Sequence, residues 1–231
     1  MIKKPKLVIL TGAGISAESG LSTFRSDNGL WENHRVEDVA TFDGWLRDKE
    51  LVLNFYNTLR QKLPTVQPNI AHLQLADLQE HYNVFIITQN VDDLHERAGS
   101  QHIIHLHGEL TKVCSSEGYL INYQDIGYNS IHIGDKCRNG TQLRPHVVWF
   151  GEPVPEYENA LSHVLEADIF AVIGTSLAVY PAAALIQYVP KNTPKYIIDP
   201  NIPPIPSSQN IFSITEKATI GVPLFAQKIK F

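Results

Sequence analysis

A cluster of polar side chains suited to orienting a small molecule follows an apolar run in the middle of the chain. Gln89, Asn90 and Asp92 come just after Val84–Ile87, a short β-branched run typical of a buried strand. In open α/β sheets, ligands bind outside the carboxyl ends of the strands, which is where these side chains would lie. A turn with a helix-capping Asn or Asp is the alternative, and this cluster alone leaves both interpretations open.

A histidine at the end of another apolar run is a candidate general base. His107 follows Ile103–Leu106 and precedes Gly108. Its ordinary pKa lies near neutrality, where an imidazole can accept a proton. His105 stands inside the expected strand and is predicted to be structural. A lone histidine is most often a satisfied polar residue, but the convergence of His107 with the first cluster at one sheet edge favours catalysis.

A glycine loop lies near the start of the chain. Gly12–Ala17 reads Gly-Ala-Gly-Ile-Ser-Ala and follows the expected strand Lys6–Thr11. The first glycine of this pattern permits a tight turn, and the second lets the backbone approach a pyrophosphate at a helix start. The acid that holds a ribose in dehydrogenases about 20 residues further on is absent, and Glu18–Trp31 reads as a polar and aromatic loop. A dinucleotide would therefore be held in another way.

The elements that must position these residues alternate between strands and helices. Helical periodicity occupies Ile70–Tyr82, Tyr157–Ala167 and Pro181–Val189. The predicted buried strands are Leu7–Leu10, Val84–Thr88, Ile103–Leu106, Ile169–Gly174, Tyr196–Ile198 and Ile211–Ile214. This alternation predicts an α/β fold with a doubly wound, parallel, Rossmann-type sheet.

Two insertions interrupt the alternation. Residues 36–66 are mostly helical, whereas residues 109–146 are polar and irregular and contain both cysteines. We predict that the two insertions form a small second module. Residues 1–35, 67–108 and 147–231 then form the Rossmann-type part of a single domain that covers residues 1–231.

Composition excludes several classes of protein. The 231 residues are 43% hydrophobic and 19% charged, which is typical of a globular chain. A net charge of −5 gives no basic excess for a nucleic-acid backbone. The uncharged stretch Ile169–Val189 is broken by Gly174–Ser176 and Pro181, which favours strand, loop and helix over a membrane span. Two cysteines, and an apolar start too short for a signal peptide, predict a cytoplasmic protein.

Taken together, these motifs resemble those of the sirtuins, the NAD-dependent protein deacylases. The resemblance implies a Rossmann-type domain with a small module built from two insertions. NAD and an acyl-lysine peptide would meet in the cleft between them. The chain looks like a compact bacterial member of the class III branch. The matching segments span nearly the whole chain: Gly12–Ser16, Thr23–Arg25, Thr88–Asp92, His105–Glu109, Arg144–Glu152 and Gly174–Ser176.

The resemblance also implies which residues bind NAD. Asp92 would hold the nicotinamide carboxamide, and Gln89 would contact the adjoining ribose. Thr175 and Ser176 would lie at the phosphate and the adenosine ribose. The family commonly has Asn at the position of Asp199, so that contact stays open. The implied set is Gly12, Ala13, Gly14, Ile15, Ala17, Glu18, Thr23, Phe24, Arg25, Trp31, Gln89, Asn90, Asp92, Gly174, Thr175, Ser176, Asp199 and Ala218.

The implied reaction consumes NAD and yields nicotinamide, free lysine and O-acyl-ADP-ribose. The acyl oxygen attacks the ribose carbon as nicotinamide leaves, in a polar pocket that stabilises the developing charge. His107 then acts as general base on a ribose hydroxyl, and Asn90 completes the implied catalytic pair. The peptide would add as a strand between Phe150–Glu152 and Leu177–Val179. The implied substrate residues are Tyr56, Leu59, Val148, Phe150, Gly151, Glu152 and Val179.

The sequence departs from the family at the metal site. Most sirtuins hold a structural zinc with two Cys-x-x-Cys pairs, whereas this chain keeps only Cys114 and Cys137. Two thiolates do not complete a four-ligand zinc site, so we predict that the module holds no metal. Packing should replace it, and the residues expected to pack are Leu120, Ile121, Tyr123, Ile131 and Ile133.

A second departure concerns the acyl group. Class III sirtuins that remove succinyl or malonyl groups carry Tyr-x-x-Arg, whose arginine pairs with the distal carboxylate. Here Tyr56 is kept, but Leu59 stands at the arginine position. Arg60 is rotated by about 100° around the helix and cannot substitute. We therefore predict a preference for acetyl and other uncharged acyl groups, with weaker desuccinylation.

Three other classes of function compete with deacylation: ADP-ribosylation, NAD-dependent oxidoreduction and non-catalytic NAD sensing. ADP-ribosylation would use the same NAD activation, and desuccinylation would use the same fold. An NAD-dependent oxidoreductase would need the missing acidic strand end. A non-catalytic NAD sensor would be expected to lack Asn90, Asp92 or His107, and all three are present. We therefore expect a deacylase, mainly a deacetylase, acting on acyl-lysine proteins or peptides, with no nucleic-acid or membrane partner.

Overall fold

The computed structural model describes residues 4–23, 30–117, 123–203 and 210–229. Phe24 and Arg25, which the family resemblance assigns to the cofactor loop, lie outside the described residues. Among the described residues, no helix is both long and apolar enough to cross a membrane.

A six-stranded parallel sheet forms the larger part of the molecule, in the order β11-β10-β9-β1-β4-β5. β1 pairs with both β4 and β9, so the winding of the sheet reverses beside β1. This is the strand order of the Rossmann fold, whose ligands bind at such a switch point. The predicted fold class is confirmed, and each predicted strand agrees to within one residue at each end. The strands are β1 (Lys6–Thr11), β4 (Asn83–Thr88), β5 (Ile103–His105), β9 (Ile169–Ile173), β10 (Lys195–Ile198) and β11 (Ile211–Ile214).

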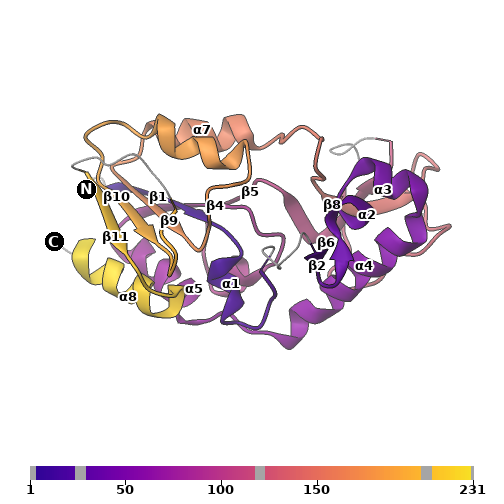
Figure 1. The fold of residues 1–231 in the computed structure, drawn as a ribbon, viewed down its shortest axis with the longest axis horizontal. Helices are drawn as coiled ribbons and strands as arrows, with labels where there is room; N and C mark the ends of the chain where they lie inside the picture. The colour runs from indigo at the N-terminus through magenta and orange to yellow at the C-terminus, as the bar shows by residue number, and fades with distance from the viewer. Residues whose placement is uncertain (1–3, 24–29, 118–122, 204–209, 230–231) are drawn as a thin grey trace.

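Helices cover both faces of the sheet, because side chains along its central strands alternate between the faces. Leu7 and Ile9 pack with α5 and α8, whereas Val8 and Leu10 pack with α7 and a 3-10 helix. Figure 1 shows α7 on one side of the sheet and α5 with α8 on the other. These helices are α5 (Ile70–Asp77), α7 (Tyr157–Leu165), α8 (Ala218–Ile229) and the 3-10 helix η4 (Ala182–Tyr188).

Three predicted helices differ from those observed. The helix predicted over Ile70–Tyr82 ends at Asp77 and continues as a 3-10 turn, Leu78–Glu80. α7 ends two residues before Ala167. The segment predicted as a helix from Pro181 to Val189 forms a 3-10 helix, and no side chain caps its start. The first amide groups of a helix have no hydrogen-bond partner within the helix, and here no capping side chain supplies one.

The two insertions come together as a second module, at the right of Figure 1. A three-stranded antiparallel sheet, in the order β7-β6-β8, packs with α2, α3 and α4 around Trp45, Tyr56 and Trp149. The second insertion is therefore more regular than the sequence predicts, because β6 finds two strand partners. The elements are α2 (Val36–Val39), α3 (Phe42–Arg47), α4 (Lys49–Lys62), β6 (Gly108–Ser115), β7 (Gln124–Asp125) and β8 (Leu143–Val147), next to the hairpin β2 (Leu30–Trp31) and β3 (His34–Arg35). We propose that residues 36–66 and 109–146 form the module and that residues 1–35, 67–108 and 147–231 form the Rossmann-type part.

A buried polar network ties α4 to the rest of the module. Arg60 is completely buried; its Nε donates to the Leu110 carbonyl at 2.5 Å, and its Nη1 donates to Asn57 Oδ1 at 2.7 Å. Asn57 also donates to the Ile131 carbonyl and accepts from the Ile131 amide. Burial lowers the pKa of Arg60 to about 10. These bonds hold the Arg60 side chain inside the module and offset part of the cost of burying its charge, although its Nη2 has no hydrogen-bond partner among the described residues.

The predicted packing of the module is only partly right. Ile131 is buried, but the side chains of Tyr123 and Ile133 are each 56% exposed. Leu120 and Ile121 lie outside the described residues. Cys114 on β6 and Cys137 are buried free thiols. The core is built instead by large side chains of α3, α4 and the segment after β8. In the sequence, the apolar spacing of these residues does not show which of the two insertions they pack against.

Candidate functional site

A cavity of about 610 Å³ lies between the carboxyl edge of the parallel sheet and the module. Its wall includes every described residue of the predicted catalytic, NAD and substrate sets except Ile15. Ile15 is completely buried and packs in the core beneath the sheet, so its side chain does not reach the cavity.

The glycine loop is shaped by contact with the loop after β9. The Gly12 amide donates to the Ile173 carbonyl at 3.0 Å, and the Gly14 amide donates to the Gly174 carbonyl at 2.9 Å. A Cβ atom on Gly14 would lie 2.6 Å from Gly174 Cα. The helix that follows, α1 (Gly14–Ala17), is only four residues long. The helix dipole expected from the sequence is therefore small, and we expect anion binding to fall mainly to side chains such as Thr175 and Ser176.

Asp92 is the centre of a buried hydrogen-bond cluster. Ser16 Oγ donates to Asp92 Oδ2 at 2.9 Å, and the Leu94 amide donates to Oδ1 at 3.1 Å. Asn90 Nδ2 donates to Ser16 Oγ and to the Gly12 carbonyl, each at 3.2 Å. Burial raises the pKa of Asp92 to about 6, against the lowering effect of its hydrogen bonds. Ser16 links the first and middle motifs, and only its place inside the glycine pattern could have signalled it.

His107 is held with one ring nitrogen available as a base. Its Nδ1 lies 3.1 Å from the Gln89 carbonyl. A carbonyl only accepts, so Nδ1 carries the proton and Nε2 keeps its lone pair. Burial lowers the pKa of His107, although the Gln89 carbonyl opposes this. The imidazole is therefore neutral at physiological pH, as a general base must be.

Two histidines that no motif singled out lie behind the cluster. His95 Nε2 is 3.1 Å from Thr11 Oγ1, and the His95 and His72 rings are 4.9 Å apart. Burial lowers the pKa of both, that of His72 to about 4. Both rings are neutral and fill space beneath the loop after β4, and the sequence carries no signal for this placement.

The module side of the cavity is aromatic. Tyr56 is completely buried, and its hydroxyl accepts from Trp149 Nε1 at 3.0 Å. Leu59 is half-buried on the same wall. The Glu152 carboxylate accepts two bonds from Arg144, at 2.7 and 2.9 Å, and one from the Trp149 amide. These bonds occupy the Glu152 carboxylate on the cavity wall.

The remaining predicted residues line the rim and the far end of the cavity. Phe150 is 47% exposed. Gln89 Nε2 donates to Thr175 Oγ1 at 3.1 Å, and Asp199 Oδ1 accepts from the Asn201 amide. The wall also includes residues that no motif singled out, and the apolar ones in the module, such as Ala40, Leu63 and Leu110, look like ordinary core in the sequence. The residues that no motif singled out include Leu21, Glu32, Ala40, Lys62, Leu63, Leu110, Tyr180 and Lys217.

The raised pKa of Asp92 has a consequence for stability. A carboxyl whose folded pKa is above its unfolded pKa stabilises the fold fully at low pH, and this contribution is lost as pH rises through about 6. We therefore expect Asp92→Asn to stabilise the protein at pH 8 by about 3 kcal/mol and to have little effect at pH 4. Thermal unfolding of both proteins at the two pH values measures the difference. Asp77→Asn, at an exposed position on α5, is the matched control, and an equal effect of Asp92→Asn at both pH values would contradict the assignment.

Comparison with known proteins identifies the family. The Sir2 family profile matches residues 12–181. An NAD-dependent protein deacylase of Bacteroides thetaiotaomicron is 54% identical over 221 residues, which are 94% of each chain. A solved Sir2 homologue in complex with ADP-ribose is 37% identical with a TM-score of 0.88, covering 99% of this chain and 95% of that one. A second solved structure, of a Sir2 homologue in complex with NAD, is 38% identical with a TM-score of 0.86, covering 97% and 89%. The strand order and these similarities agree, and the chain belongs to the Sir2 family.

Proposed function

We propose that this Sir2-family chain, an NAD-dependent protein deacylase, acts mainly as a protein-lysine deacetylase in the cytoplasm. The observation that carries the acetyl preference is the placement of α4. Tyr56 and Leu59 line the cavity, whereas the guanidinium of Arg60 is bonded inside the module. No arginine of α4 therefore reaches the position at which a distal carboxylate would be paired.

The cavity has the features that NAD binding requires. The amide and carboxyl groups of Gln89, Asn90 and Asp92 converge on one part of its wall, and Thr175 faces Gln89. The close contact of Gly14 with Gly174 keeps side chains out of the glycine loop. When bound, NAD supplies nicotinamide as the leaving group and ADP-ribose as the acceptor of the acyl group. The names of the related proteins support this assignment.

The chain's own residues then have distinct roles. Asp92, as a carboxylate, accepts from the nicotinamide carboxamide and orients the ring. Asn90 stands beside it, with its side chain fixed by Ser16 and the Gly12 carbonyl. Nε2 of His107 accepts the proton of a ribose hydroxyl, which can then attack the acyl carbon. The buried polar groups act without reorganising, which is how such a site stabilises developing charge.

The substrate is an acyl-lysine peptide, held along the cavity rim. Phe150–Glu152 and Val179 line the cavity from two sides. We propose that the peptide adds to these segments by backbone hydrogen bonds, while Val148 and Phe150 border the acyl-lysine side chain. We propose no nucleic-acid or membrane partner.

His107→Ala tests the role of the general base. We expect the kcat for deacetylation to fall at least about 100-fold, because a positioned base contributes that much or more. The affinity for NAD should change little. Rates on an acetylated peptide, with NAD affinity measured by calorimetry, give both values. A variant that keeps most of its rate would remove His107 from the mechanism.

Leu59→Arg tests the acyl preference. The wild-type enzyme should act faster on an acetylated than on a succinylated peptide of the same sequence. We expect Leu59→Arg to raise the rate on the succinylated peptide at least about tenfold, because a paired guanidinium is worth one or two kcal/mol. Leu59→Met, similar in size and uncharged, is the matched control. If Leu59→Arg gains nothing while Leu59→Met behaves as wild type, Leu59 does not border the distal acyl group.

Removal of metal tests the proposed absence of a structural zinc. Cys114 and Cys137 are the only cysteines, and the thiol of Cys137 bonds to Asn139 and Thr141. We expect incubation with a chelator to leave the Tm unchanged and elemental analysis to give much less than one zinc per chain. A fall in Tm on chelation, reversed by added zinc, would show instead that the module holds a metal.

A further inference from the structure

The loop that carries Asn90 is held through its carbonyl groups by one neighbouring segment. His107 Nδ1 lies 3.1 Å from the Gln89 carbonyl, and His105 Nδ1 lies 3.0 Å from the Asn90 carbonyl. The Leu110 amide donates to the Val91 carbonyl at 2.8 Å. Three consecutive peptide groups of the cavity wall are therefore oriented from His105–Leu110, which covers the end of β5, the turn and the start of β6.

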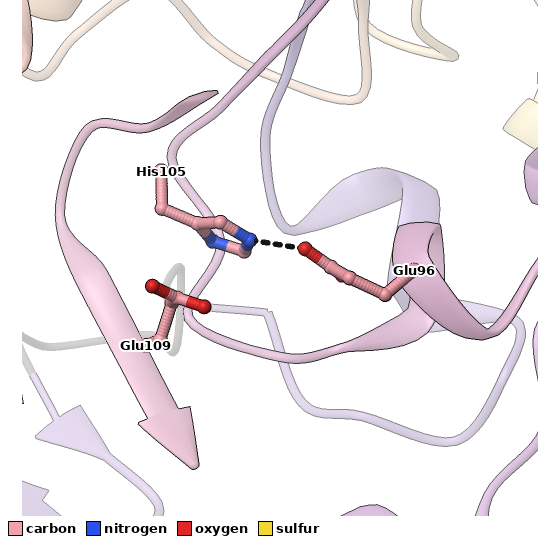
Figure 2. A group of neighbouring side chains, drawn as sticks. All are labelled: Glu96, His105 and Glu109. Atoms are coloured by element: carbon pink, nitrogen blue, oxygen red, sulfur yellow. Dashed lines mark hydrogen bonds and ion pairs between the residues drawn. The ribbon is translucent and has the colours of Figure 1, made fainter. Parts of the chain in front are cut away.

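His105 differs from His107 in what its second nitrogen does. Nε2 of His105 lies 2.7 Å from Glu96 Oε1, as the dashed line in Figure 2 marks. Glu96 belongs to α6 (Leu94–Arg97), the short helix that directly follows the loop that carries Asn90. A carbonyl and a carboxylate both accept, so both nitrogens of His105 donate and its ring is an imidazolium. The His105 side chain is only 8% exposed, whereas the Glu96 side chain is 40% exposed, so the pair is shielded from water on the histidine side.

The charges around His105 support this state. Burial alone would lower the pKa of His105, but Glu96 and Glu109 together raise it. His105 in turn lowers the pKa of Glu96 despite burial. Glu109 also lies beside the ring in Figure 2 and pairs with Lys112 at 2.6 Å. Two carboxylates and two cations balance, so the group is complete without a metal ion.

We propose that the Glu96–His105 pair is a positioning device for Asn90. Glu96 fixes the His105 ring, and Nδ1 of that ring fixes the Asn90 carbonyl. The orientation of this peptide group sets the direction of the Asn90 side chain, whose own bonds, to Ser16 and the Gly12 carbonyl, are both 3.2 Å long. His105 is thus a positioning residue rather than a catalytic one, and its role rests on the function proposed above.

Two substitutions at His105 separate its two nitrogens. The side-chain nitrogen of Asn is as many bonds from Cα as His Nδ1, so His105→Asn keeps a donor for the Asn90 carbonyl. His105→Gln places its nitrogen near Nε2 and loses that donor. We expect His105→Gln to lower kcat about tenfold or more, since small misplacements of reacting groups are that costly. His105→Asn should stay within about threefold of the wild-type kcat, and the KM for the peptide should change in neither.

Variants of Glu96 and His102 test the other parts of the proposed positioning device. Glu96→Ala, at an exposed position on α6, should lower kcat in the same direction as His105→Gln without changing the peptide KM. His102→Gln, at an exposed position just before β5, is the matched control and should behave as wild type. Equal losses in His105→Asn and His105→Gln, or unchanged kcat in both His105→Gln and Glu96→Ala, would overturn the proposal. A fall in Tm alone, with kcat intact, would also overturn it.

The affinity for NAD separates this proposal from the proposed function. An inactive wild-type protein that still binds NAD would contradict the proposed function. In that case, the NAD affinities of the two His105 variants would still test the positioning role of His105. His105→Gln should bind NAD more weakly than His105→Asn, because Asn90 lines the cavity, and equal affinities would refute the positioning role.

Discussion

The close contact between Gly14 and Gly174 is the constraint on which the site depends. It occurs at the switch point of the sheet, where the loops after β1 and β9 touch. Gly174 has a φ of +63°, a conformation that side chains disfavour, and a Cβ atom on it would lie 2.4 Å from the Ile15 amide nitrogen. With this contact in place, Ser16 meets Asp92 and Asn90 of the loop after β4. The loops after β1 and β4 thereby contribute to one buried polar cluster.

The module is coupled to this cluster through the turn between β5 and β6. His107 contacts the Gln89 carbonyl through its ring, and its own carbonyl accepts from the Val148 amide at 2.9 Å. Val148 precedes Trp149, which bonds to Tyr56 on α4. His107, the proposed general base, is thus tied by its backbone to the wall that would hold the acyl group. This arrangement explains why the cavity lies between the two parts rather than within either.

Much of the fold could be predicted from the sequence. The strands are short β-branched runs between loops, and the motifs of Gly12, Gln89 and His107 stand at their ends, so local pattern was sufficient to place these motifs at one edge of the sheet. The other proposed site residues were implied by the resemblance to the sirtuins and not by local pattern. The direction of a side chain on a helix was harder to derive. That Arg60 is bonded inside the module depends on Asn57 and on Leu110, which is 50 residues away. The placement of Ile15 in the core and the strands of the second insertion also depend on tertiary partners that periodicity does not reveal.

In the proposed reaction, one cavity joins NAD cleavage to acyl transfer. Incubation of the purified protein with NAD and an acetylated peptide, followed by mass spectrometry, measures both steps at once. Equal amounts of free-lysine peptide, nicotinamide and O-acetyl-ADP-ribose are expected, with no product when NAD is omitted. NAD that stays intact, or NAD that is cleaved while the peptide keeps its acetyl group, would contradict the account.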